Sequence, residues 1–174
     1  MAISLLLTVL LPALLIVAAV SDLASYTIPN VLPATLVALF AILLLELALA
    51  GHGMSYSAAG FHLLAGIAGL VIGMAFFAFG WVGGGDAKLF AAVALWLGWG
   101  VLIEYAIALS LLGGALTFGL ILLRRIPLPA RLAQWAWLAR LADPKAGIPY
   151  GVALAAAALV VLPDSEIFSL VVGG

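Results

Sequence analysis

Two aspartates occupy settings in which carboxyl groups can do acid–base chemistry. Asp22 lies in the stretch SDLASYTIPN, and Asp86 follows three consecutive glycines in FGWVGGGDAKLF. Two carboxyl groups in contact share one proton, because the charge of one raises the pKa of the other. One group then activates water as a general base while its partner protonates a carbonyl oxygen, which hydrolyses a peptide bond without a metal. We therefore predict that Asp22 and Asp86 form a catalytic pair.

The remainder of the chain has the composition of a membrane protein. Of its 174 residues, 68% are hydrophobic and 7% are charged, and the mean hydropathy is +1.40. A soluble domain contains about 25% charged residues, so we predict an integral membrane protein. The net charge of −1 supplies no basic field for nucleic acid. The chain has no cysteine, which excludes disulfides, cysteine-ligated zinc and thiol catalysis.

Six apolar segments predict an all-α bundle of about six transmembrane helices, which forms a single domain over residues 1–174. We expect the helices at about residues 2–20, 30–50, 58–81, 87–97, 101–123 and 148–163. No Lys or Arg precedes Lys88, so the first segment is expected to be a retained helix rather than a signal peptide. The last residues, 164–174, either fray or continue the final helix with a kink.

The fourth and sixth segments are short. They give only roughly 16–23 Å of helix, less than the hydrocarbon core of a bilayer. We therefore expect their first residues, including the stretch GGGD, to lie in a recess below the membrane surface. Non-helical backbone is tolerated at that depth where it lines a cavity, so we predict a small water-filled pocket at Asp86.

The cationic residues predict the orientation of the bundle. Five of the six lie between the fifth and sixth segments, and short loops rich in Lys and Arg stay in the cytoplasm. These five are Arg124, Arg125, Arg131, Arg140 and Lys145. Residues 124–147 are therefore expected to form a cytoplasmic or interfacial segment. Counting back through six crossings places the N-terminus outside and both aspartates at the cytoplasmic face.

Three stretches together resemble the type IV prepilin peptidases, which are membrane aspartic proteases of the GxGD class. They are SDLASYTIPN, GGGDAKL and GIPYG at residues 147–151, in that order along most of the chain. The resemblance implies that Asp22 and Asp86 are catalytic and that Gly83 and Gly85 are the glycines of the GxGD motif. It also implies a site without metal or cofactor at the cytoplasmic side of a prokaryotic inner membrane, with prepilin and pseudopilin precursors as substrates.

The chain departs from the larger members of that family. Those members carry a tetracysteine zinc module and an extended N-terminal region associated with methylation of the new N-terminus, and this sequence has neither. It resembles the short, peptidase-only members that serve Flp-type tight-adherence pili. We therefore expect cleavage without N-methyltransferase activity, with lipid and precursor as partners and no nucleic acid.

Several further residues are expected to shape the site, in roles that the sequence leaves open. Pro29 and Asn30 would shape the turn that positions Asp22, and Asn30 would cap the second helix. Lys88 would bias the charge of the pair, contact substrate or anchor at the membrane surface. In the stretch GIPYG, Pro149 and Gly151 would begin the last helix, and Tyr150 would hydrogen-bond in the site or lie at the interface. His52 and His62 are not expected to bind a metal, because no acid or cysteine cluster joins them.

Other functions are consistent with the same residues. A preflagellin peptidase would share the two aspartates. A small transporter or proton-conducting bundle would use Asp22 and Asp86 as relay acids. A structural subunit would use Asp22 as a helix-end residue and Asp86 as a helix cap, and would tolerate their replacement by Asn.

Overall fold

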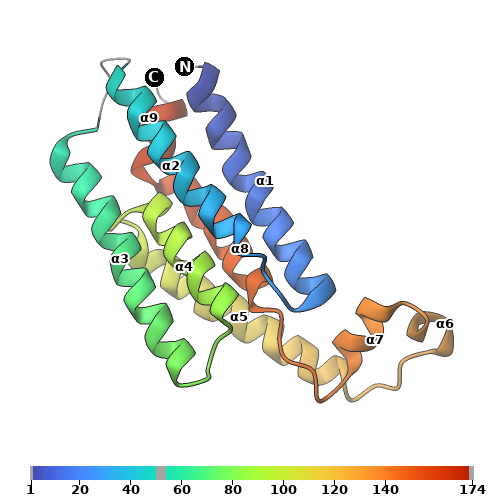
Figure 1. The fold of residues 1–174 in the computed structure, drawn as a ribbon. Coiled ribbons are helices and arrows are strands. Elements are labelled where there is room, and N and C mark those ends of the chain that lie inside the picture. The colour runs from blue at the N-terminus through green and yellow to red at the C-terminus, as the bar shows by residue number, and fades with distance from the viewer. Residues whose placement is uncertain (1, 50–53, 173–174) are drawn as a thin grey trace.

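The computed structural model describes residues 2–49 and 54–172, and this part of the chain is helical without strands (Figure 1). Four helices are long and apolar enough to cross a membrane: α1 (Ala2–Ser25), α2 (Val31–Leu49), α3 (Tyr56–Ala78) and α5 (Leu102–Leu123). The predicted all-α membrane class is thereby confirmed. The helices α4 (Gly84–Leu97) and α8 (Tyr150–Val161) are shorter, so the count of about six crossings and the side of the N-terminus stay predictions.

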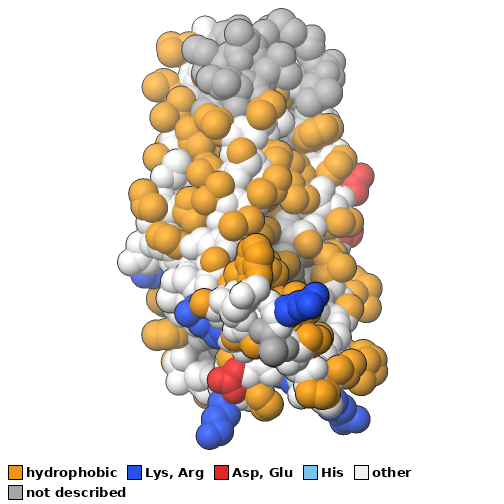
Figure 2. Space-filling view, turned by 90° about the vertical axis from the view of Figure 1, so that its right-hand side faces the viewer, with side chains coloured by type: hydrophobic (Ala, Val, Ile, Leu, Met, Phe, Trp, Pro, Cys, Tyr) orange, Lys and Arg blue, Asp and Glu red, His pale blue; other side chains and the backbone are white. Residues whose placement is uncertain are grey.

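The two short helices lie in the interior of the bundle (Figure 1). Helix α4 is buried without interruption from Ala92 to Leu97, and α8 is buried along most of its length. By contrast, α3 and α5 expose many large apolar side chains, and apolar side chains also cover much of the face of the molecule seen in Figure 2. A helix that is apolar on all sides is stable either in a core or against lipid, and both situations occur here.

Glycines bring α3 and α4 into close contact. A side-chain carbon at Gly69 would lie 3.0 Å from Cβ of Ala94, and one at Gly73 would lie 3.0 Å from the carbonyl oxygen of Ala87. Small residues three or four apart allow such close approach of helix backbones in lipid. This contact holds α4, and with it Asp86, against a membrane-spanning helix.

The structure corrects two predicted helix boundaries near the aspartates. Helix α1 continues past Val20 to Ser25, so Asp22 lies within its last turns and not behind its end. Helix α4 starts at Gly84, so most of the stretch GGGD is helical. Its first turn is stable because Asp86, at the third helical position, accepts a hydrogen bond from the N-cap amide of Gly83.

Both aspartates lie at the same end of the bundle, together with the segment between α5 and α8. This segment contains α6 (Ala130–Ala133) and α7 (Ala136–Ala142) and projects beyond the bundle (Figure 1). Most cations gather at this end (Figure 2). At the opposite end, a 3₁₀ turn at Leu162–Asp164 leads into α9 (Glu166–Val172), so the tail forms a separate short helix.

Candidate active site

Asp22 is held by the first turn of α8. Its side chain is 4% exposed, and its Oδ2 accepts a hydrogen bond of 2.7 Å from the backbone amide of Gly151. The first amides of a helix have no partner within the helix. Asp22 satisfies one of these donors, which explains how a buried carboxyl group is tolerated near the end of α1.

Asp86 is held more loosely, by its own helix. Its Oδ2 accepts a hydrogen bond of 3.2 Å from the amide of Gly83, while its Oδ1 is buried and accepts none from the residues described. Asp86 lies in α4, outside the four long apolar helices. Burial and the negative charge of nearby Asp22 raise its pKa to about 6, and the Gly83 hydrogen bond opposes this shift. The two aspartates are therefore close enough to influence each other's protonation.

Ile28, in the turn between α1 and α2, joins the starts of α4 and α8. A side-chain carbon at Gly85 would lie 3.0 Å from its Cβ, and one at Gly151 would lie 2.8 Å from its Cδ1. Both distances are shorter than ordinary van der Waals contact, so only glycine fits at either position without movement. The three stretches singled out in the sequence thus converge on one isoleucine, which sequence reasoning did not identify as part of the site.

Lys88 and Asn30 form a direct link between α4 and the start of α2. The Nζ of Lys88 donates a hydrogen bond of 2.8 Å to Oδ1 of Asn30. Asn30 directly precedes α2, and its backbone carbonyl oxygen accepts a bond from the amide of Ala34, as at an N-cap position. Its side chain forms the interhelical bond from Lys88, and the predicted side-chain capping role stays a prediction. Pro29 stands beside it, and its carbonyl oxygen accepts a bond from the amide of Leu32 in the first turn of α2.

In the stretch GIPYG, Gly151 contacts Asp22, whereas Pro149 and Tyr150 pack elsewhere in the bundle. Pro149 is buried at the N-cap of α8. The ring of Tyr150 packs on Gly113, and its hydroxyl lies 3.4 Å from Oγ1 of Thr117 on α5. Tyr150 therefore fastens α8 to α5, and its hydroxyl is directed at α5.

Hydroxyl groups secure the turn that follows Asp22. Oγ of Ser21 donates to the carbonyl oxygen of Thr27, and Oγ of Ser25 lies 2.7 Å from Oγ1 of Thr27. Between them Tyr26 adopts a φ of 56°, in the left-handed region that non-glycine residues rarely occupy. Ser and Thr residues clustered at a helix end are a sequence signal for such side-chain hydrogen bonds to the neighbouring turn.

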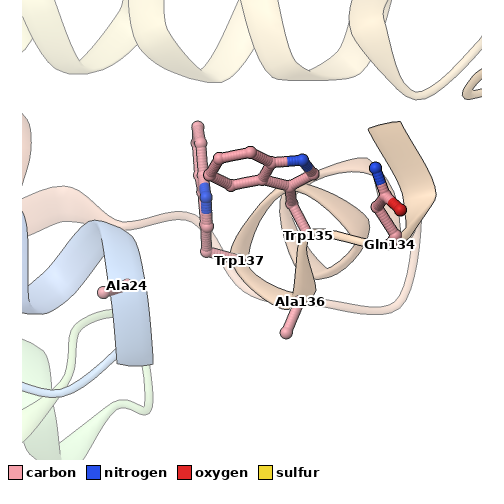
Figure 3. Close-up of a pocket in the computed structure, with 5 residues that line it drawn as sticks. All are labelled: Ala24, Gln134, Trp135, Ala136 and Trp137. Atoms are coloured by element: carbon pink, nitrogen blue, oxygen red, sulfur yellow. The ribbon is translucent and has the colours of Figure 1, made fainter. Parts of the chain in front are cut away.

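Two arginines attach α7 and the linker before α8 to the bundle. Nη1 of Arg140 donates to the carbonyl oxygen of Ala24 at the end of α1, and Nη2 of Arg124 donates to that of Gly147. A shallow hollow of about 590 Å³ lies beside this junction, lined by Ala24 and residues 134–137, with the rings of Trp135 and Trp137 facing it (Figure 3). These contacts fix the linker that leads to Gly151, which sequence reasoning did not foresee.

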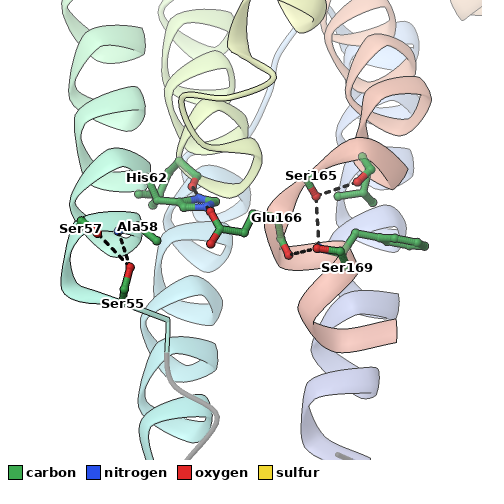
Figure 4. A network of polar contacts seen from close by, with 10 residues as sticks. Ser55, Ser57, Ala58, His62, Ser165, Glu166 and Ser169 are labelled. Carbon is green, nitrogen blue, oxygen red and sulfur yellow. Dashed lines mark hydrogen bonds and ion pairs between the residues drawn. The ribbon is translucent and has the colours of Figure 1, made fainter. Parts of the chain in front are cut away.

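The opposite end of the bundle carries a second polar cluster (Figure 4). Nδ1 of His62 is 2.8 Å from the carbonyl oxygen of Leu95, and Nε2 is 3.9 Å from Oε2 of Glu166. Among the described residues, no group of three or more His, Cys, Asp or Glu is placed to hold a metal ion. His52 lies outside the described residues. His62 packs against Gly98, where a side-chain carbon would lie 2.7 Å from the ring, so it fastens α3 to the end of α4.

Trp96 belongs to the core of the bundle. Its side chain is buried, and its Nε1 donates a hydrogen bond of 2.8 Å to the carbonyl oxygen of Leu36 on α2. A buried indole needs such a partner, and α4 lies in the core, so Trp96 contributes to packing.

Comparison with known proteins gives one match. The profile of the type IV leader peptidase family matches residues 9–119, which is more than half of the chain and includes both aspartates. No curated protein and no solved structure matches the chain.

Proposed function

Since the chain belongs to the type IV leader peptidase family, a family of membrane-embedded proteases that act on precursor proteins, we propose that it cleaves leader peptides with Asp22 and Asp86 as its catalytic pair. The observation that carries this proposal is the buried Oδ1 of Asp86, which has no partner in the described part of the chain and lies near the charge of Asp22. Strongly perturbed acids in one site are typical of catalysis.

The pair supports hydrolysis by general acid–base chemistry. A pKa of about 6 for Asp86 means that the two groups hold one proton between them over a range of pH that ends near 6. One carboxylate removes a proton from water, the water oxygen attacks the carbonyl carbon, and the protonated partner donates to the carbonyl oxygen. Collapse of the tetrahedral intermediate breaks the C–N bond, and the amine leaves with a proton.

We further propose the finer features of this function. The substrates are prepilin and pseudopilin precursors of the Flp type, and cleavage proceeds without N-methylation, since the chain has no cysteine for a zinc module. The bundle crosses a prokaryotic inner membrane about six times, with the N-terminus outside and the chain forming one domain. The gathering of cations at the end that carries both aspartates supports a cytoplasmic site.

Co-expression with a pilin precursor tests the proposal. Asp22→Asn and Asp86→Asn should each abolish the shortening of the precursor on a gel, because neither Asn can take part in proton transfer as the pair does. Asp164→Asn is the matched control, since this exposed acid lies at the opposite end and its replacement should leave processing intact. Processing by either site variant at the wild-type level would refute the assignment, and proton flux without cleavage would indicate a relay function.

A further inference from the structure

The two carboxyl groups of the site have unequal surroundings. Asp22 receives a short hydrogen bond, 2.7 Å from the amide of Gly151, whereas the bond from Gly83 to Asp86 measures 3.2 Å. Both oxygens of an ionised carboxylate seek donors, and a buried one without a donor is costly. Oδ1 of Asp86 has no partner among the described residues, so the neutral, protonated form of this group is less costly to bury than a charged carboxylate.

Gly151 combines its donor with a complete lack of space for a side chain. A carbon added there would lie 2.9 Å from both Cβ and Oδ2 of Asp22, and 2.8 Å from Cδ1 of Ile28. The closeness of these atoms lets the amide of Gly151 reach the carboxylate. Any residue other than glycine would push Asp22 away from the donor.

No nearby cation offers Asp22 an alternative partner among the described residues. The other titratable or charged groups near this end of the elements around it include Asp86, Lys88, Tyr26, Tyr150, Arg124 and Arg140. Lys88 is bound to Asn30, and the hydroxyl of Tyr150 is directed at Thr117. The two arginines donate to backbone carbonyl oxygens, and Tyr26 has no bonded partner for its hydroxyl within the described chain.

We propose that Gly151 is a positioning residue whose amide holds Asp22 as the ionised general base, so that the shared proton resides on Asp86. This inference rests on the proposed function and divides the roles within it. Asp22 takes a proton from water as the water oxygen bonds to the carbonyl carbon, and Asp86 gives its proton to the carbonyl oxygen. When the C–N bond breaks, Asp22 returns its proton to the leaving nitrogen, and Asp86 recovers a proton from the hydroxyl of the intermediate as the new carboxyl group forms.

Kinetics of Gly151→Ala with a purified precursor, over a range of pH, test the inference. Displacement of Asp22 from its donor should lower kcat by tenfold or more with little change in KM. The acidic limb of the pH–rate profile reports ionisation of the base, Asp22. This limb should move to higher pH by about one unit, because the variant weakens the hydrogen bond from residue 151 that favours the charged form of Asp22. The alkaline limb, which reports the proton on Asp86, should move less.

Two further variants separate this effect from a general packing defect. Gly113→Ala is the matched control, because it is a buried helical glycine that faces α8, where an added carbon meets only Tyr150 at 3.5 Å and Ala153 at 3.8 Å. It should retain the wild-type profile. Ile28→Val removes the Cδ1 atom from the clash at position 151, so the double variant Gly151→Ala/Ile28→Val should remain impaired. Full recovery in the double variant would show that the effect passes through Ile28 and would overturn the inference.

Infrared difference spectra supply a measurement that does not depend on activity or on Gly151. At a pH below 6, where Asp86 holds its proton, the carbonyl stretch of a protonated carboxyl group should disappear in Asp86→Asn. Loss of that band in Asp22→Asn with its retention in Asp86→Asn would reverse the assigned roles. If Asp22→Asn abolishes cleavage while Gly151→Ala behaves as wild type, the proposed function stands and this inference fails. If Asp22→Asn still cleaves, the proposed function fails first.

Discussion

The sharpest prediction compares two adjacent glycines in the stretch GGGD. A side-chain carbon at Gly85 would lie 3.0 Å from Cβ, 3.2 Å from the carbonyl oxygen and 3.4 Å from the amide nitrogen of Ile28. Two of these atoms are backbone, so they cannot rotate away. At Gly84, the same carbon would meet only the ring of Phe77, at 3.5 Å, which is ordinary contact. Gly85→Ala should therefore impair the enzyme, and Gly84→Ala should not.

The size of the effect follows from the displacement that Gly85→Ala imposes. The turn at Ile28 and the start of α4 must separate by a few tenths of an ångström to restore van der Waals contact. Overpacking of this kind costs about 1–3 kcal/mol of folding free energy. Asp86 follows Gly85 directly, and misplacing a catalytic group by about 1 Å costs roughly 100-fold in rate, so a smaller shift should cost about tenfold or more.

Two assays measure these consequences. Precursor processing on a gel gives the initial rate of cleavage, and thermal unfolding in detergent gives the change in stability. Both variants replace glycine by alanine in the first turn of one helix, so their helix propensities change alike. Equal losses of activity in Gly84→Ala and Gly85→Ala would show that the contact with Ile28 is not what requires glycine at position 85. Normal processing by Gly85→Ala would show the same.

Two other predictions follow from the site. Burial and the charge of Asp22 raise the pKa of Asp86 to about 6, above its ordinary value of 3.8. The contribution of Asp86 to stability is therefore complete below pH 3.8 and falls as the pH rises through 6. Thermal unfolding of the wild type should show this loss, and an unchanged pH dependence in Asp86→Asn would contradict it. Lys88 donates to Asn30 at an exposed position, so Lys88→Met and Asn30→Ala should each lower the free energy of unfolding by about 0.5–1.5 kcal/mol. The two losses should not add in the double variant, because both variants remove the same bond. Full additivity would rule out the link between α2 and α4.

The chemistry of the site was easier to anticipate than its architecture. Asp22 and Asp86 stand out because carboxyl groups are rare and costly in apolar segments. Their place at one end of the bundle follows from helices that alternate in direction, and the structure has them there (Figure 1). Each of these inferences needs only the order of apolar and polar residues along the chain.

The boundaries near the aspartates were harder to predict for a local reason. The polar residues of SDLASY indicated the end of a helix, yet α1 continues to Ser25. The carboxylate of Asp22 and the hydroxyl groups of Ser21 and Ser25 find partners in the turn and in α8. A polar side chain that finds a partner is tolerated within an apolar helix, and the partner of Asp22, the amide of Gly151, lies far along the chain.

The order of residues along the chain is enough to predict a helical membrane protein with Asp22 and Asp86 at one end. The contacts that hold these acids arise only when the helices pack: the amide of Gly151 donates to Asp22, Ile28 lies between Gly85 and Gly151, and Lys88 donates to Asn30. These contacts could not be predicted because α2, α5 and α8 are apolar on all sides. Hydropathy therefore specifies that such helices lie in lipid or core, but the rotation of each about its own axis is set by close packing between residues distant in sequence.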